Sequence, residues 1–456
     1  MTTTHDPRPS RLGSWLERLV DVHDEEVSRL LWSIGYFFFL LLSYYILRPI
    51  RDEMGLHGGV RNLPYLYLGT LAGVIVAHPI FTWLVTRYPR KLFVPITYRC
   101  FAVCILLFFA AMRWGPETAS VAVARTFFVW VSVFNMFVVS IFWGFMADLW
   151  SNVQGKRLFG LIGAGGTAGA IAGSWLTAWF VQLVGAASLL LVSALLLEVA
   201  VQCVRRLERS PTAAAGPPPA PASPHSVTGL AEAPAPRGRT LGTLRGVVNG
   251  VWLVLSSTYL AGICAYIFLF TITSTFLYFE QANIVDAAIT DRTARTSFFA
   301  WVDVAVNVLT LAVQLFLTGR IMRWLGVPLT LAVLPALTIA GFSALALAPT
   351  LVVVAAFSIL RRGMNYAVAR PAREVLYTVV GREEKYKAKN FIDTFVYRGG
   401  DALAAFAFKA LNDLVTGLAG VALIAVPIAA VWGAVGLFLG RRQRALAEET
   451  LTSNRP

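Results

Sequence analysis

The residues of this sequence best suited to bind a charged molecule are arginines that lie inside long apolar segments. Arg361 and Arg362 stand side by side near the middle of one such segment, and Asn365 and Tyr366 follow them closely. An arginine at mid-depth in a bilayer costs about 2.5–3.5 kcal/mol, so it needs a carboxylate, water or an anion beside it. Guanidinium groups bind carboxylates and phosphates through paired hydrogen bonds. The pattern therefore indicates a site for a negatively charged molecule.

Similar residues lie near the ends of two other apolar segments. Arg51 closes the first segment shortly after two tyrosines, and Arg125 lies near the start of the fourth. A tyrosine beside a guanidinium can pack against an organic ring of a bound molecule. The candidate substrate-binding residues are Arg51, Arg125, Arg361, Arg362, Tyr44, Tyr45, Asn365 and Tyr366.

Carboxylates in or beside the apolar segments belong to the same question. Each could be a fixed ion-pair partner for an arginine, or could couple movement of the bound molecule to a proton or another ion. The two interpretations are compatible, because a bound anion can exchange with an internal carboxylate for the same arginine. The candidate coupling or charge-pair residues are Asp52, Asp303, Glu374 and Asp401.

Membrane-spanning helices must position these groups. The 456 residues are 57% hydrophobic and only 14% charged, and the mean hydropathy is +0.65. A hydrocarbon core about 30 Å thick needs about 20 apolar residues per helical crossing, and backbone groups in lipid must bond within their own segment. The predicted crossings are 30–50, 64–86, 92–112, 120–143, 158–184, 187–204, 259–279, 298–317, 327–347, 351–368, 391–411 and 417–439.

The crossings fall into two groups of six around a Pro- and Ala-rich stretch that cannot bury a core. Asp148 and Gly155 follow the fourth crossing at the same spacing as Glu374 and Gly381 follow the tenth. We expect an all-α integral membrane protein with 12 transmembrane helices in two six-helix repeats, like the major facilitator superfamily, with a central cavity between the repeats. The predicted parts are a cytoplasmic segment 1–29, a first half 30–204, a flexible cytoplasmic linker 205–245, a second half 246–440 and a cytoplasmic tail 441–456.

Basic residues gather in the connections on one side of the predicted membrane. Lys and Arg favour the cytoplasmic side, so we expect both termini in the cytoplasm and the protein in the inner (plasma) membrane of a bacterium. This topology accounts for the net charge of +14, and no basic soluble domain is present to bind a nucleic acid polymer. A predicted cytoplasmic basic rim would attract either substrate or anionic membrane lipid. Its residues are Lys156, Arg157, Lys387 and Lys389.

The sequence does not indicate an enzyme, a cofactor or a metal site. It contains no P-loop lysine motif, zinc-protease motif or nucleophile elbow. Cys100 and Cys104 lack a nearby histidine or carboxylate and are interpreted as packing residues. Gly165, Gly169 and Gly173 repeat every four residues inside an apolar segment, which predicts close packing against another helix rather than a dinucleotide loop.

Three short stretches of the sequence match a known family: residues 142–145 and 156–163, then residues 387–393 with Arg398 and Gly400, and Arg51 with Asp52. They resemble the nucleotide (ATP/ADP) translocases found in plastids and intracellular bacteria. One resembles the segment after their fourth helix, one their lysine-rich approach to helix eleven, and one the basic–acidic pair after helix one. The resemblance implies a major-facilitator-like fold and exchange of nucleotides, or of other phosphorylated or anionic solutes.

We therefore expect a secondary active transporter that moves an anionic solute by alternating access. Nucleotide exchange (ATP/ADP, NTP/NDP) is the first hypothesis. The alternative is a proton-coupled major-facilitator transporter of a different organic anion or small molecule. The expected partners are a small anionic substrate and membrane lipid, and the protein is expected to be a monomer.

Overall fold

The computed structural model describes residues 24–209, 254, 257–381, 388, 389, 392, 396–415 and 417–453. These residues form helices and no strand. The main helices are α2 (Asp24–His57), α3 (Leu63–Arg87), α4 (Arg90–Trp114), α5 (Ser120–Leu149), α6 (Asn152–Arg209), α8 (Thr258–Ala288), α9 (Arg292–Phe316), α10 (Thr318–Leu347), α11 (Leu351–Met364), α12 (Arg370–Leu376), α14 (Tyr397–Leu414) and α15 (Leu418–Ser453). Shorter segments are η1 (Val60–Asn62), η2 (Glu117–Ala119), the π-helix η4 (Asn365–Ala369) and η5 (Tyr377–Val379).

Ten of the described helical segments are long and apolar enough to cross a membrane. This confirms the expected all-α membrane fold. Helix α14 covers most of the eleventh predicted crossing and is not among the ten, because its 18 residues include several charges. The predicted total of twelve crossings stays a prediction.

Helix α6 is one of the ten segments, but its 58 residues reverse direction at Gly185. The φ angle of Gly185 is +77°, in the left-handed region that glycine adopts without strain. Before this turn, α6 runs parallel to α2. After it, α6 runs antiparallel to α2, because Ser193 hydrogen-bonds to Ser43 and Cys203, ten residues later, lies beside Gly35. The two limbs correspond to the predicted crossings 158–184 and 187–204.

The predicted glycine contact is confirmed where the first limb of α6 crosses α2. A Cβ on Gly165 would lie 2.6 Å from the Ile34 side chain, and one on Gly169 would lie 2.2 Å from the Phe38 carbonyl oxygen. The absence of side chains lets the two backbones touch, which gives dispersion contacts that lipid cannot replace. The contact belongs to one half of the protein and holds α2 against the rest of that half.

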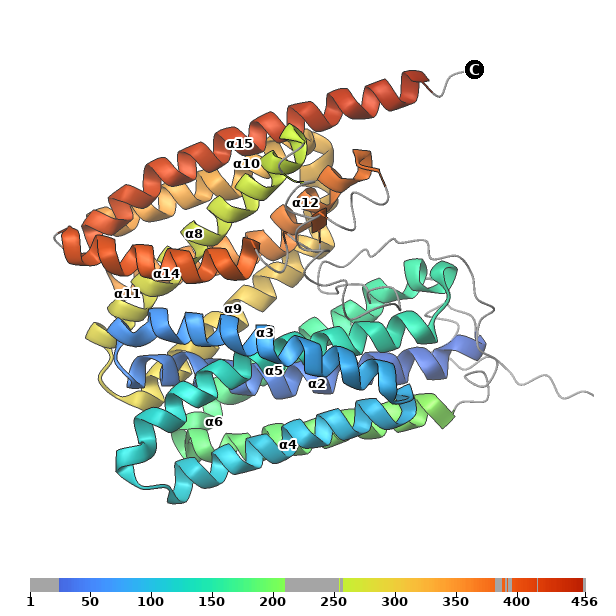
Figure 1. Ribbon diagram of the computed structural model, residues 1–456, viewed down its shortest axis with the longest axis vertical. Coiled ribbons are helices and arrows are strands. Elements are labelled where there is room, and N and C mark those ends of the chain that lie inside the picture. Colours follow the sequence, from blue (N-terminus) through green and yellow to red (C-terminus); the bar gives the residue numbers. More distant parts are fainter. Residues whose placement is uncertain are drawn as a thin grey trace, which may run out of the picture.

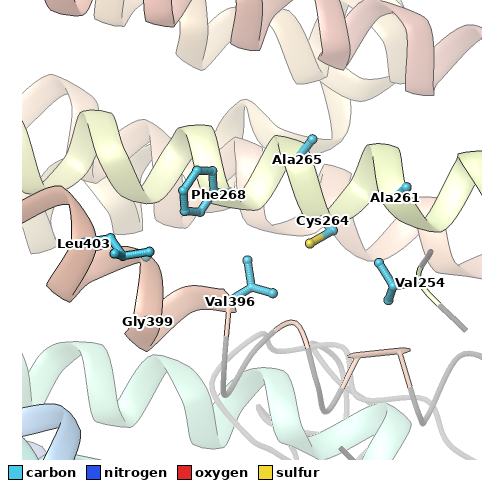
Figure 2. A pocket seen from close by; sticks show the side chains of 9 residues that line it. Val254, Ala261, Cys264, Ala265, Phe268, Val396, Gly399 and Leu403 are labelled. Carbon is cyan, nitrogen blue, oxygen red and sulfur yellow. The ribbon is translucent and has the colours of Figure 1, made fainter. Parts of the chain in front are cut away.

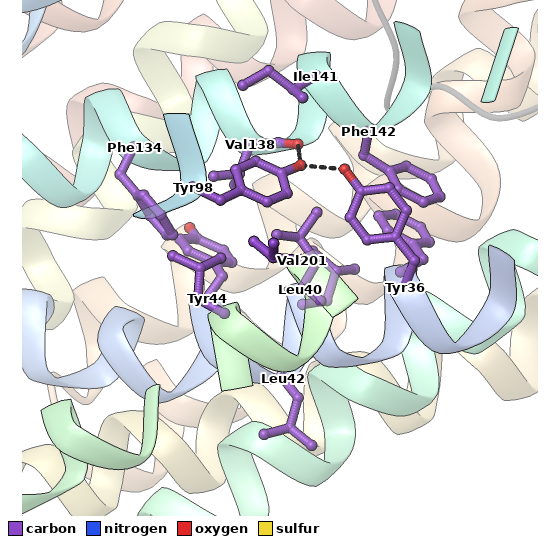
Figure 3. Close-up of a cluster of buried hydrophobic side chains, with 14 of the residues drawn as sticks. Tyr36, Leu40, Leu42, Tyr44, Tyr98, Phe134, Val138, Ile141, Phe142 and Val201 are labelled. Carbon is purple, nitrogen blue, oxygen red and sulfur yellow. Dashed lines mark hydrogen bonds between the residues drawn. The ribbon is translucent and has the colours of Figure 1, made fainter. Parts of the chain in front are cut away.

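Aromatic side chains fill the core of the N-terminal half (Figure 3). The hydroxyl groups of Tyr36 and Tyr98 hydrogen-bond to each other, and Tyr98 also donates to the Val138 carbonyl. Phe37 stacks on Phe142 with ring centroids 4.0 Å apart. Buried tyrosines need such partners for their hydroxyl groups. This packing makes the half a rigid frame for α2, the helix that carries several candidate site residues.

Three helices extend beyond the predicted ends of the two halves. Helix α2 begins at Asp24, inside the predicted segment 1–29, and α6 continues to Arg209, inside the predicted linker. Residues 210–245 lie outside the described part of the chain. Helix α15 runs on to Ser453 through the predicted tail, because residues 441–450 contain no helix breaker. Gln443 of this extension is buried, so the tail begins as a packed continuation of the last helix.

The two halves meet at one end of the bundle, which we call the closed end. It is the end at which α2 and α8 finish and α3 and α9 begin. A buried apolar cluster there mixes the halves, with Leu56 and Leu63 beside Phe279 and Phe408. The other two large apolar clusters each lie within one half. Figure 1 shows the halves as an upper and a lower group of helices, joined where α3 lies beside α14 and α6 beside α9.

Candidate functional site

The central feature between the halves is a carboxylate shared by two arginines. Asp303 of α9 accepts a 2.5 Å hydrogen bond from Nη2 of Arg362 on α11. Its other carboxylate oxygen lies 3.5 Å from Nε of Arg48 on α2. The Asp303 side chain is 2% exposed, whereas those of Arg48 and Arg362 are 16% and 22% exposed. One negative charge between two positive charges leaves this cluster, which we call the Asp303 cluster, with a net positive charge.

Two tyrosines and a second ion pair extend the Asp303 cluster along α2. The Tyr45 hydroxyl accepts a 3.3 Å hydrogen bond from Arg48, whose guanidinium lies 5.4 Å from the Tyr45 ring centre. One turn on, Asp52 pairs with Arg51 at 3.4 Å and accepts a 3.2 Å hydrogen bond from the Tyr278 hydroxyl of α8. The N-terminal half thus presents aromatic and cationic groups to the C-terminal half.

The π-helix η4 places a further aromatic–cation pair beside Arg362. A π turn leaves backbone carbonyls without their usual helical partners, and such turns often occur at functional sites. Here the Gln314 amide donates to the Tyr366 carbonyl at 3.3 Å, and the Thr318 hydroxyl donates to the Ala367 carbonyl at 2.8 Å. The Arg370 guanidinium lies 6.0 Å from the Tyr366 ring centre. Side chains of α9 and α10 therefore hold this irregular turn in place.

Arg361 lies apart from the Asp303 cluster, although it is the neighbour of Arg362. It is 2% exposed, and its guanidinium donates to Thr338 of α10 and to Thr273 of α8 at 3.1 and 2.8 Å. It also lies over the rings of Phe270 and Trp432. Successive residues of a helix point about 100° apart, so Arg361 enters the core of the C-terminal half while Arg362 faces the other half.

One other predicted substrate-binding residue is not brought to the Asp303 cluster. Arg125 is exposed, and its guanidinium lies 3.4 Å from the Gly58 carbonyl at the closed end. Tyr44 lies at the edge of the cluster, with its ring centre 5.2 Å from that of Tyr45, and packs against Phe134 in the core of the N-terminal half (Figure 3). Asn365 is 9% exposed, and its carbonyl oxygen has no hydrogen-bond partner among the described residues.

The remaining predicted carboxylates have local partners. Asp401 accepts a 3.0 Å hydrogen bond from Thr275 and lies 3.8 Å from Arg398. Glu374 pairs with Lys389 at 2.9 Å rather than with an arginine.

The predicted basic rim is only partly described. Arg157 pairs with Glu26 at 2.7 Å, and Lys389 pairs with Glu374. Lys387 and the side chain of Lys156 lie outside the described part. The described rim residues therefore take part in ion pairs within the protein.

Arg48 and Tyr278 are site residues that the sequence interpretation missed. The predicted crossing 30–50 ends two residues after Arg48, which places this side chain near the membrane surface. Its spacing was an available signal, because it lies three residues after Tyr45 and three before Arg51, on one face of a helix.

Polar contacts at the closed end hold the halves together beyond the Asp303 cluster. Arg292 of α9 donates to Glu53 of α2 at 2.8 Å, and Ser297 of α9 donates to the Ala178 carbonyl of α6 at 2.9 Å. The Glu53 side chain is only 2% exposed, so removing its partner leaves a buried charge.

Arg292→Ala is expected to shift the protein toward a conformation open at this end. Arg292 is 47% exposed, so solvent screens the pair and the effect should be about 1–2 kcal/mol, or roughly 5- to 30-fold in population. The measurement is thiol labelling of Cys introduced at buried Ser297 in a cysteine-free background. Arg295→Ala is the matched control, since Arg295 pairs with Asp286 within one half. An equal labelling rate in both variants would contradict the assignment of Glu53–Arg292 as a tie between halves.

An apolar pocket of about 390 Å³ lies between α8 and α14. Figure 2 shows Phe268 and Cys264 of α8 directed toward the space beside α14. Among the described residues, no charged side chain lines this pocket, so these walls offer no cation to an anion. Its lining residues are Val254, Ala261, Cys264, Ala265, Phe268, Val396, Gly399, Gly400 and Leu403.

Comparisons with known proteins agree with this architecture. No protein-family model and no curated protein matches the sequence. Among solved structures, an auto-inhibited peptide transporter of the POT family is similar with a TM-score of 0.59 and 14% identity, over 91% of this chain and 97% of that chain. A variant of the nucleoside transporter NupG is similar with a TM-score of 0.55 and 14% identity, over 92% of this chain and 99% of that chain. The chain therefore has a multi-pass helical fold of the major-facilitator type.

Proposed function

We propose that this protein is a secondary transporter that moves an organic anion by alternating access. The observation that carries the proposal is the Asp303 cluster, in which Arg48 of one half and Arg362 of the other converge on a single carboxylate. The fold shared with two transporters supports the class of function, and the contacts at the closed end support a conformation in which the halves are tied together on that side. The protein catalyses no covalent reaction in this proposal.

In the proposed cycle, Asp303 occupies the place of the substrate anion. An arriving carboxylate or phosphate takes the hydrogen bonds of Arg48 and Arg362, which are strong because both partners are charged. The bound anion then links the two halves through Arg48 and Arg362, the same two arginines that Asp303 links in its absence. Release restores the internal pair, so neither state leaves a guanidinium unpaired in a poorly hydrated space.

Nucleotide exchange is the specific substrate proposal. It is supported by the resemblance of residues 142–145, 156–163 and 387–393 to nucleotide translocases, and by the rings of Tyr45 and Tyr366 beside cationic groups. The alternative is proton-coupled transport of a different organic anion, which the buried carboxylates favour. If transport is proton-coupled, a pH gradient should drive uptake without a counter-nucleotide. If the protein exchanges nucleotides, a pH gradient alone should not drive uptake.

The proposed setting is a bacterial inner membrane with both termini in the cytoplasm. The basic connections support this orientation, and the closed end then faces away from the cytoplasm. The proposed partners are a small anionic substrate and anionic lipid near the basic rim, and the proposed active unit is a monomer.

Uptake by purified protein in proteoliposomes tests the function. Labelled ATP and ADP, then organic phosphates and carboxylates, would be offered with and without internal counter-substrate. Saturable uptake of any of these anions supports the proposal. Liposomes with folded protein that take up none of them would contradict it.

Adjacent arginines provide a matched pair of variants for the site. Arg362→Met is expected to reduce uptake at least about tenfold, because a lost charge-assisted contact is worth about 1.5–3 kcal/mol. Arg361→Met should change uptake much less, because that guanidinium is buried among Thr338, Thr273 and aromatic rings. Initial uptake rates at equal amounts of reconstituted protein are the measurement. If the larger loss followed the Arg361 substitution, the Asp303 cluster would not be the binding site.

A further inference from the structure

Glu280 of α8 is a buried acid without a partner. It is 1% exposed, and neither of its carboxyl oxygens has a hydrogen-bond partner among the described residues. By contrast, Asp52, Asp303 and Asp401 each have a cation and a hydrogen-bond donor nearby. A dry, unpartnered carboxyl group cannot keep its negative charge, so it takes up a proton instead.

The surroundings of Glu280 follow from its place on α8. It lies two turns after Thr273, which binds Arg361 of α11, and five turns after Gly262, whose added Cβ would lie 2.9 Å from Leu439 of α15. Glu280 therefore faces α11 and α15. Apolar residues of these helices, among them Val354, Phe357, Val421 and Ala425, form one buried cluster with Phe276 and Ile284 of α8.

Charged groups on the described elements around α8 are either engaged elsewhere or exposed, and Arg61 of η1 is exposed. Arg361 is the titratable residue that α11 directs into this core, and it is bound to threonines and a carbonyl about two turns of α8 away. The 418–440 part of α15 and the 330–347 part of α10 contain no titratable residue. On α14, Asp401 is bound by Thr275, Lys409 lies over the Tyr65 ring, and Asp413 is exposed.

The turn of α8 that carries Glu280 also forms the closed end. Tyr278 donates to Asp52 of α2, and the ring of Phe279 lies 5.6 Å from the ring of Tyr67 on α3. Separation of the halves at this end would break both contacts and admit water beside this turn. The proton on Glu280 and the closure of this end are therefore linked equilibria.

We propose that Glu280 is a proton-binding site that stabilises the conformation closed at this end. In the closed conformation the carboxylic acid keeps its O–H bond. Opening hydrates the turn, the O–H bond ionises, and the proton passes to water while Glu280 becomes a carboxylate. Because one proton is linked to opening, the open-to-closed ratio rises by at most about tenfold per pH unit. The inference uses the alternating-access cycle of the proposed function but does not depend on the identity of the substrate.

Two measurements on the full chain in detergent test this site without any substrate. Infrared difference spectra during a rise in pH should show loss of the carbonyl band of a protonated carboxylic acid. Spin labels on Cys introduced at exposed Thr118 and Ala348, in a cysteine-free background, should move apart over the same pH range. These positions lie at the closed end on opposite halves, so their separation reports opening.

Glu280→Gln mimics the protonated acid and should abolish both signals, leaving the labels close at every pH. Asp286→Asn is the matched control, since Asp286 lies on the same helix, is 39% exposed and is already paired with Arg295 at 2.7 Å, and it should behave like the unsubstituted protein. A protonated-acid band that persists in Glu280→Gln, or label distances that do not respond to pH in the unsubstituted protein, would overturn the proposal. If Glu280→Gln fails to fold, the pH response of the label distances in the unsubstituted protein still tests the proposal. Failure of anion uptake would contradict the proposed function and leave these spectroscopic results unaffected.

Discussion

Asp303→Asn is expected to tighten anion binding and slow transport in the same protein. The substitution removes the carboxylate that competes with a bound anion for Arg48 and Arg362. Charge-assisted hydrogen bonds contribute about 1.5–3 kcal/mol, so the affinity should rise about tenfold or more. Release then lacks the internal anion that replaces the substrate, so turnover should fall by a similar factor. Calorimetric titration with ADP and proteoliposome exchange measure the two effects separately.

Asp286→Asn is the control for the change in charge. Asp286 pairs with Arg295 at 2.7 Å within the C-terminal half, and its side chain is 39% exposed. This variant should bind and transport like the unsubstituted protein. Weaker ADP binding by Asp303→Asn would contradict the proposed exchange, because it would mean that Asp303 organises the arginines for the ligand instead of competing with it.

The contrast between Arg361 and Arg362 marks the limit of prediction from sequence at this site. Both residues are visible as costly charges in an apolar segment, and both were expected to bind substrate. Their different surroundings depend on Thr338 of α10 and Asp303 of α9, which are distant in sequence. A single sequence indicates that a charge needs a partner, but it does not say which neighbouring helix supplies it.

Arg48 shows how an error in helix length becomes an error about the site. The predicted crossing ended at residue 50, which placed Arg48 near water. The helix instead continues to His57, so Arg48 lies nine residues, or about 13 Å, before its end. Hydropathy ends a crossing at the first group of charges. The partners of these charges, Asp303, Tyr278 and Arg292, come from the other half of the chain.

The fold was more predictable than the site because its signals are local. Apolar length indicates a membrane helix regardless of what the helix touches, and the spacing of small residues indicates a close contact. The predicted break between 184 and 187 matches the turn at Gly185, where a glycine is needed for the positive φ angle. The sequence does not show that α2 is the helix that packs against Gly165, Gly169 and Gly173, and the structure identifies it.

Gly169→Ala is expected to destabilise the protein, whereas Gly160→Ala on the same helix should stabilise it slightly. The new Cβ at position 169 would lie 2.2 Å from the Phe38 carbonyl oxygen, and a backbone atom cannot rotate away as a side chain can. Moving α2 and α6 apart should cost about 3 kcal/mol, at the upper end of the usual range for overpacking. A Cβ at position 160 meets nothing within 4 Å, so that variant gains about 0.5–1 kcal/mol from reduced backbone entropy.

Thermal unfolding in detergent, followed by the loss of monodisperse protein, compares the two glycine variants directly. The same methyl group is added to α6 in both, so detergent and helix propensity contribute equally and the contact with α2 accounts for the difference. Equal melting temperatures would mean that α2 and α6 are not in backbone contact. Because α2 also carries Arg48, a shift of this helix should weaken the Asp303 cluster, and Gly169→Ala should reduce uptake even in the fraction that remains folded.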